Sequence, residues 1–202
     1  MKKNSTKDKI FKVSLELFSK KGYNEVSVRE IAREVGIKES SIYNHYSKKE
    51  AILDDIFNYF IKNMYKAETS KKNMNSLLMK GPDKLYNFGS EMVKYQFSKP
   101  DMVKILRLIF IEMYRNDKIK EFFQKELIEK PIEFWTCFYK DLMNQKIIKK
   151  SDPEKLAKYY YEYGMFKMFE VIVIKYPLKI NYEEVFNDIE GHFNFILESQ
   201  RV

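Results

Sequence analysis

The sequence predicts an all-α protein, and three observations support this prediction. The chain has 202 residues but only 6 glycines and 5 prolines, so few positions would interrupt a helix. Apolar residues recur at spacings of three and four, which is the period of a helix with one buried face. No stretch alternates apolar and polar residues long enough to predict a β-strand.

The first two helices are marked by their end signals. Ser5 or Thr6 can cap the start of the first helix, and Lys20-Lys21-Gly22 ends it with two cations followed by a glycine. Ser27 opens the second helix, and Glu30 three residues later completes the S-x-x-E pattern of a capping box. Gly36 ends this helix after only two or three turns.

A short third helix follows Ile37, and a fourth begins near Ser47 with Glu50 as a second capping box. The remaining chain is also helical in pattern, with a turn expected near Asn73–Gly81. Further helix starts are expected at Gly81-Pro82-Asp83, Ser98-Lys99-Pro100-Asp101, Pro131 (a start or a kink), Ser151-Asp152-Pro153-Glu154 and Tyr182, the last running to about Ser199.

The positive charge is concentrated at the N-terminal end. Residues 1–50 carry 12 Lys and Arg against 7 Asp and Glu, so this quarter of the chain holds five of the eight net charges. A basic end on a nearly neutral body favours an N-terminal module that binds an anion. A general bias toward lysine for solubility would produce the same charge, so composition alone leaves both interpretations open.

Two short helices joined by a tight turn at Gly36 have the shape of a helix-turn-helix. Ala32 is small where the helices approach closely, and Ile42 is apolar where the third helix packs on the second. This packing leaves polar side chains on the outer face of the third helix, and such groups can bind phosphates or read base edges. The alternative is a solvated polar helix without a partner. The outward residues are Lys38, Ser40, Ser41, Tyr43, Asn44 and His45.

Residues 10–56 resemble the DNA-binding domain of the TetR family of bacterial transcriptional regulators. The resemblance rests on Leu17-Phe18, Gly22-Tyr23, Ser27-Val28, Ile31-Ala32, Val35-Gly36, Ile42-Tyr43, His45-Tyr46, Lys49-Glu50 and Leu53. It implies a DNA-binding domain over residues 1–50 and a helical ligand-binding and dimerisation domain over residues 51–202. Tyr46 stands where the family usually has phenylalanine, and Glu39 places an acid on the recognition helix.

The resemblance also implies roles for single residues. Ser27 and Arg29 are expected to touch the DNA backbone or groove edge from the second helix. The six outward residues of the third helix are expected to face the major groove, with Tyr43 and His45 on phosphates. Lys49 is expected to hold a phosphate at the start of the fourth helix, and Tyr46 is expected in the core.

The body of the chain predicts a homodimer. The helix of about residues 153–176 is apolar nearly all round between Tyr159 and Ile174, and a helix of that kind is buried on two sides. We expect it to pair with the helix of about residues 182–199 and with both symmetry mates. The alternative is that both helices close the core of one monomer.

The resemblance further implies a small-molecule effector, apolar or amphipathic, that releases a repressor from a pseudo-palindromic operator in double-stranded DNA. Methionine and aromatic residues can line an adaptable pocket for it, although plain core packing explains any single one equally well. The candidates are Tyr95, Leu106, Phe110, Met113, Tyr114, Trp135, Phe138 and Tyr139. Glu112 lies among them and is either a buried partner for a cation or a solvated residue.

Other classes of protein are disfavoured by the sequence. It has two histidines far apart, no H-E-x-x-H, no phosphate-binding loop and no nucleophile elbow, so we expect neither an enzyme, nor a metal site, nor a cofactor. Cys137 is its single cysteine and is expected in the core. One cysteine and no apolar leader favour the cytoplasm, and no run is long enough for a membrane span. A helical adaptor or an activator of the same fold remains the alternative.

Overall fold

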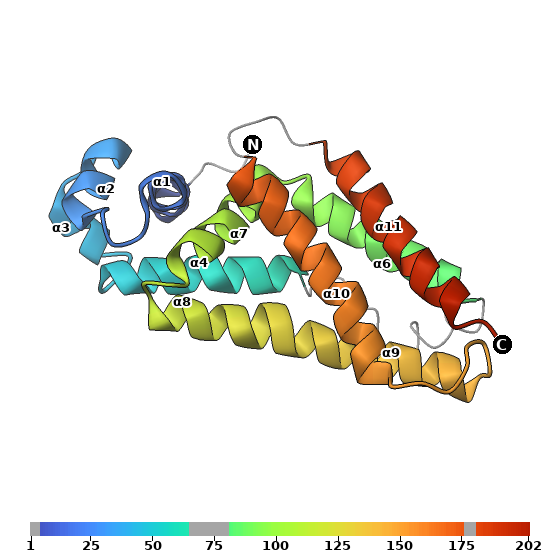
Figure 1. Ribbon diagram of the computed structural model, residues 1–202. Coiled ribbons are helices and arrows are strands. Elements are labelled where there is room, and N and C mark those ends of the chain that lie inside the picture. Colours follow the sequence, from blue (N-terminus) through green and yellow to red (C-terminus); the bar gives the residue numbers. More distant parts are fainter. Residues whose placement is uncertain (1–4, 65–80, 176–180) are drawn as a thin grey trace. The chain divides into compact units, whose positions relative to one another are not determined.

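The computed structural model describes residues 5–64, 81–175 and 181–202, and these residues contain helices but no β-strand. The predicted all-α fold is therefore confirmed (Figure 1). The α-helices are α1 (Thr6–Lys21), α2 (Val28–Val35), α3 (Glu39–Tyr43), α4 (Lys49–Met64), α6 (Pro82–Phe97), α7 (Pro100–Glu112), α8 (Asp117–Phe122), α9 (Lys130–Asn144), α10 (Pro153–Phe169) and α11 (Tyr182–Ser199). Two π-helical segments, η1 (Phe123–Glu129) and η2 (Glu170–Ile174), extend α8 and α10.

Most of the predicted helix starts agree with the structure. Ser5 forms a complete capping box, in which its hydroxyl accepts from the Asp8 amide at 3.1 Å and its own amide donates to the Asp8 carboxylate at 3.0 Å. Asp152 caps α10 by accepting from the amides of the next two helical residues after Pro153. The expected turn at Asn73–Gly81 lies outside the described residues except for Gly81. No described helix combines the length and the apolar character that a bilayer crossing requires.

The chain divides into two compact units. The first contains residues 1–68 and 99–116, so α7 groups with the N-terminal helices α1 to α4. Helix α1 packs against α2, α4 and α7, and the Arg107 side chain on α7 donates to the Ser19 carbonyl on α1 at 3.3 Å. The core of this unit is built by apolar residues of all these helices, including Ile10, Leu15, Phe18, Ile31, Ile42, Ile52, Leu53, Ile56, Ile105 and Ile109.

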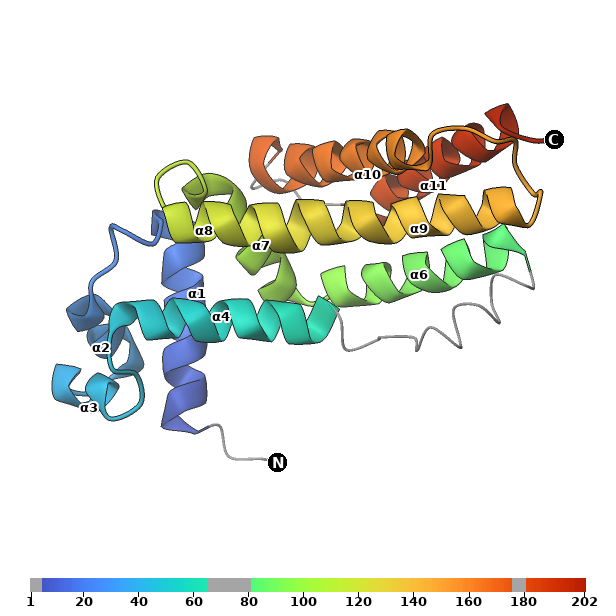
Figure 2. The ribbon, with the colours of Figure 1, turned by 90° about the horizontal axis from the view of Figure 1, so that it is seen from below.

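The second unit contains residues 69–98 and 117–202. Helix α8, the π-helical segment and α9 form one continuous rod (Figure 2), and Pro131 lies in the first turn of α9. Helix α9 packs on α10, α10 on α11, and α11 on α6. Aromatic rings fill the space between these helices, and the Tyr86 and Phe193 rings stack at 4.0 Å.

Candidate nucleic-acid interface

Helices α2 and α3 meet at a tight turn centred on Gly36. Gly36 has φ 77° and ψ 35°, a left-handed conformation that costs a residue with a Cβ free energy. The Ile37 amide then donates back to the Ala32 carbonyl at 3.0 Å. Ala32 and Ile42 are both buried where the two helices pack. The turn and the packing are those of a helix-turn-helix.

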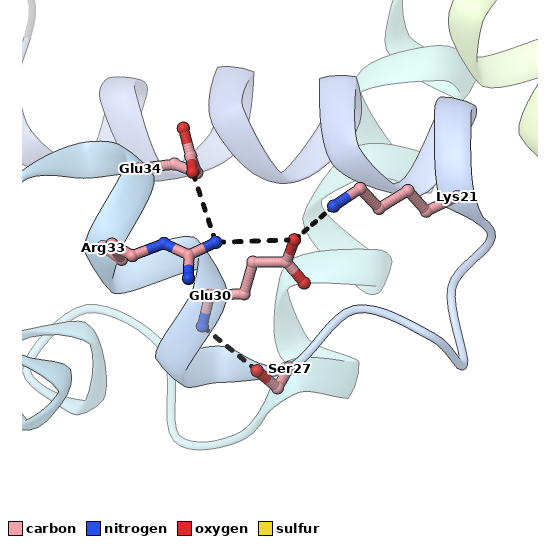
Figure 3. Close-up of polar contacts among 5 residues, drawn as sticks. All are labelled: Lys21, Ser27, Glu30, Arg33 and Glu34. Carbon is pink, nitrogen blue, oxygen red and sulfur yellow. Dashed lines mark hydrogen bonds and ion pairs between the residues drawn. The ribbon is translucent and has the colours of Figure 1, made fainter.

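Ser27 caps α2, but only half of the predicted capping box forms. The Ser27 hydroxyl accepts from the Glu30 amide at 3.1 Å, whereas the Glu30 carboxylate binds the Lys21 ammonium at 2.6 Å instead of returning to the Ser27 amide (Figure 3). A charged donor makes the stronger hydrogen bond, and this bond with Lys21 lowers the pKa of Glu30. The start of α2 is therefore tied to the end of α1.

The predicted contact residues of α2 and α3 lie mainly on the solvent side. Tyr43 is 50% exposed, and Ser41 is half-buried. The acid at Glu39 is exposed in the first turn of α3, beside the predicted contacts. The outer face thus presents hydroxyl, amide, imidazole and cationic groups together. The exposed members of the predicted set are Ser27, Arg29, Lys38, Ser40, Tyr43, Asn44 and His45.

Lys49 differs from the other predicted contacts because its side chain points inward. Its ammonium donates to the carbonyls of Tyr23 and Val26, each at 2.9 Å, and lies 4.3 Å from the centroid of the Tyr23 ring. Burial lowers the pKa of Lys49. The predicted phosphate contact of Lys49 stays a prediction, and the structure adds an internal role that the sequence did not indicate.

Tyr46 lies in the core, as predicted, only three residues from the exposed Tyr43. It is 4% exposed, and its hydroxyl donates to the Asp55 carboxylate at 2.7 Å. Burial raises the pKa of Tyr46, and the hydrogen bond to Asp55 raises it further, so the phenol stays neutral. Asp55 also pairs with Lys7 at 3.3 Å. The bond between Tyr46 and Asp55 joins the segment after α3 to α4.

We expect Tyr46→Phe to lower the free energy of unfolding by about 1 kcal/mol, because it removes one partly buried hydrogen bond and keeps the ring. DNA affinity should change little. Urea denaturation followed by circular dichroism, together with DNA titration, measures both quantities. Tyr43→Phe is the matched control, since it should leave the free energy of unfolding unchanged and reduce DNA affinity. The reverse pattern would contradict the assignment of the two tyrosines.

The predicted pocket residues fall into two groups. Trp135, Phe138 and Tyr139 gather in the second unit, where the Trp135 ring lies 4.4 Å from Tyr160 and the Phe138 ring 6.0 Å from Phe193. Tyr139 is fully buried, and its hydroxyl has no hydrogen-bond partner among the described residues. Leu106 and Phe110 are buried and Met113 half-buried in the first unit, whereas Tyr95 and Tyr114 are exposed.

Two further residues show what the sequence could not decide. Cys137 was expected in the core but is exposed, because the buried side of α9 is formed by its neighbours Phe138 and Tyr139. Glu112 could have been solvated but is only 7% exposed, at the C-terminal end of α7. Its position inside the apolar run 108–114 was the only sequence signal for this burial.

The fold and this interface define a helix-turn-helix protein with a helical body. Residues 10–56 match the family model described as bacterial regulatory proteins of the tetR family. The solved structure of a TetR-family transcriptional regulator from Mesorhizobium loti superposes with a TM-score of 0.69 at 17% identity, covering 98% of this chain and 97% of that one. Residues 10–56 therefore form a DNA-binding domain of the tetR type, and the fold of the chain is similar to that of this solved regulator.

Curated relatives with similar sequences are transcriptional regulators. The HTH-type transcriptional regulator YerO of Bacillus subtilis is 31% identical over 129 residues, which are 62% of this chain and 43% of YerO. IcaR of Staphylococcus epidermidis, a negative transcriptional regulator of the biofilm operon icaADBC, is 44% identical over 59 residues, which are 27% of this chain and 32% of IcaR. The chain thus spans less than half the length of these relatives.

Proposed function

We propose that the chain is a dimeric, DNA-binding transcriptional regulator that represses transcription until a small apolar or amphipathic effector releases it from a pseudo-palindromic operator. Residues 1–50 bind DNA, and residues 51–202 bind the effector and form the dimer. Two recognition helices enter successive major grooves, roughly 34–36 Å apart or a multiple of that distance. The name of IcaR, a negative regulator, supports repression.

The outward face of α3 is the observation that carries this proposal. Its polar side chains are exposed except for the half-buried Ser41, while Ile42 on its other side and Tyr46 just beyond its end are buried in the unit core. A helix that is packed on one side in this way can enter a major groove with its exposed side, and its contacts with the core stay intact. In our proposal, Tyr43 and His45 bind phosphates and Ser40, Ser41 and Asn44 approach base edges.

The body supports a dimer and an effector in different ways. Helices α10 and α11 leave large apolar side chains exposed, and such patches mark interfaces between proteins. The aromatic cluster around Trp135 and Tyr139 offers rings and one unpaired hydroxyl to an apolar molecule with a polar group. A difference in affinity of about 1–3 kcal/mol between the DNA-bound and free conformations is enough for release.

A gel shift with DNA from upstream of the chain's own gene tests the proposal. We expect a complex that depends on DNA sequence and weakens as salt rises, because phosphate contacts release counterions. The absence of any DNA complex would favour the alternative of a helical adaptor that binds protein. Transcription assays on the shifted DNA then separate a repressor from an activator.

We expect Lys38→Ala to weaken operator binding about tenfold and to lower the slope of log affinity against log salt by about one per subunit, because a positive charge that faces the DNA in our proposal is lost. The melting temperature should not change, since Lys38 is exposed. Lys62→Ala is the matched control, because it removes an exposed lysine from the last turn of α4. Equal losses for both variants would show that only overall charge matters.

A further inference from the structure

The connection between α1 and α2, residues 22–27, is held by a lysine from the start of α4. The Lys49 ammonium has three N–H donors, and two of them donate to the carbonyls of Tyr23 and Val26, at 2.9 Å each. The face of the Tyr23 ring lies 4.3 Å away and adds a cation–π contact. A phosphate could therefore take only the one donor that remains.

An acid from the end of α7 packs against the same connection. Glu112 is buried, and its carboxylate lies so close to Gly22 that a Cβ at that position would collide with it. One of its oxygens has no hydrogen-bond partner within the described ranges. A buried carboxylate is costly unless a positive charge compensates it. Lys49 and Glu112 thus approach the same connection from two helices, the cation at Tyr23 and Val26 and the acid at Gly22. The negative charge of Glu112 favours the charged form of Lys49 and so partly opposes the lowering of its pKa by burial.

The connection controls where the DNA-binding helices begin. Val26 is fully buried, and the next residue, Ser27, is the cap of α2. Fixing the Val26 carbonyl therefore fixes the direction in which α2 leaves the connection. Helix α3 packs on α2 and follows any change in that direction. A small error in its angle would spoil several DNA contacts at once.

We propose that Lys49 and Glu112 are positioning residues for DNA binding, which fix the connection at residues 22–27 and through it the recognition helix, and that Lys49 makes no phosphate contact of its own. This inference rests on the proposed DNA-binding function. In this proposal, both residues set the position of the recognition helix relative to DNA, and neither changes the number of phosphate contacts.

The test is a salt series of operator affinity for the full-length wild type and Lys49→Met. We expect the variant to bind at least tenfold more weakly with an unchanged slope of log affinity against log salt. A lost phosphate contact would instead lower the slope by about 0.9 per subunit, and that result would overturn the proposal. A wild type that binds no DNA would overturn the proposed function as well, so the two failures are distinguishable.

Glu112→Gln is a second test, because a role in positioning and a simple effect of charge predict opposite changes in DNA affinity. It keeps the side-chain volume and removes a negative charge, so electrostatics toward DNA alone would strengthen binding. We expect binding about tenfold weaker, with the slope again unchanged. In the double variant, the loss should be clearly smaller than the product of the two single losses, because the residues act as one unit. Tighter binding by Glu112→Gln, or losses that multiply, would overturn the proposal.

Discussion

Replacing Gly22 with alanine should lower the free energy of unfolding by about 2–3 kcal/mol. Gly22 has φ 92° and ψ 155°, a conformation that is essentially reserved for glycine and costs a residue with a Cβ about 1–3 kcal/mol. The added Cβ also collides with the Glu112 carboxylate. This carboxylate ends a rotatable side chain, so it can turn away, but it is buried and can move only by disturbing the packing around it.

Gly36→Ala is the matched control for this prediction. Gly36 also has a positive φ, 77°, but a Cβ there would meet no described atom within 4 Å. We therefore expect a loss of only about 1 kcal/mol from the backbone alone. Urea denaturation of both variants, followed by far-ultraviolet circular dichroism, compares them directly. If both lose the same free energy, the contact with Glu112 contributes nothing.

A double-variant cycle isolates the collision itself. In a Glu112→Ala background, the Gly22→Ala change should cost about 1 kcal/mol less than in the wild type, because only the backbone cost remains and no carboxylate has to be displaced. A cost that is unchanged from the wild-type background would show that the whole effect comes from the backbone conformation of residue 22 and that the collision contributes nothing. The cycle needs no DNA, so it tests the packing of the connection independently of the proposed function.

The sequence predicted most helix boundaries because these depend on local chemistry. Ser5, Gly36 and Asp152 end or begin helices through bonds to residues at most five positions away, and such bonds are visible in a short window of sequence. The π-helical segments were not predicted. Their hydrogen bonds reach one residue further along the chain than those of an α-helix, and no capping or turn residue in the sequence marks this change.

The candidate interface was predicted less completely, for the same reason. The outward face of α3 follows from helical periodicity around Ile42 and Tyr46. The inward turn of Lys49 depends instead on carbonyls that lie 23 and 26 residues away in the chain. Likewise, Glu30 prefers Lys21 over its local partner Ser27 once α1 and α2 are brought together. Long side chains with a charge at their end are free to choose partners that only the fold supplies.

The double substitution of glutamate for Phe166 and Phe195 should convert the proposed dimer into a monomer. These rings are 60% and 69% exposed on α10 and α11, and both helices are firmly joined, since the Tyr163 ring stacks on the His192 ring at 4.1 Å. In a dimer the two phenylalanines would be covered by the partner subunit. Two carboxylates per subunit would then have to be buried without cations, which costs several kcal/mol per subunit.

Light scattering after size-exclusion chromatography measures the mass of the particle in solution. The wild type should have twice the chain mass of 24.5 kDa, and the double variant should have the mass of a single chain. Operator affinity should fall by about 100-fold or more, because a monomer engages one half-site and loses the gain from linked binding. Tyr114→Glu is the control and should stay dimeric. Tyr114 is 94% exposed and follows α7 in the first unit, away from α10 and α11 in the sequence. A wild type that is monomeric at micromolar concentration would refute the dimer. A double variant that stays dimeric would instead move the interface to another surface, because two unpaired charges per subunit are incompatible with a buried apolar contact.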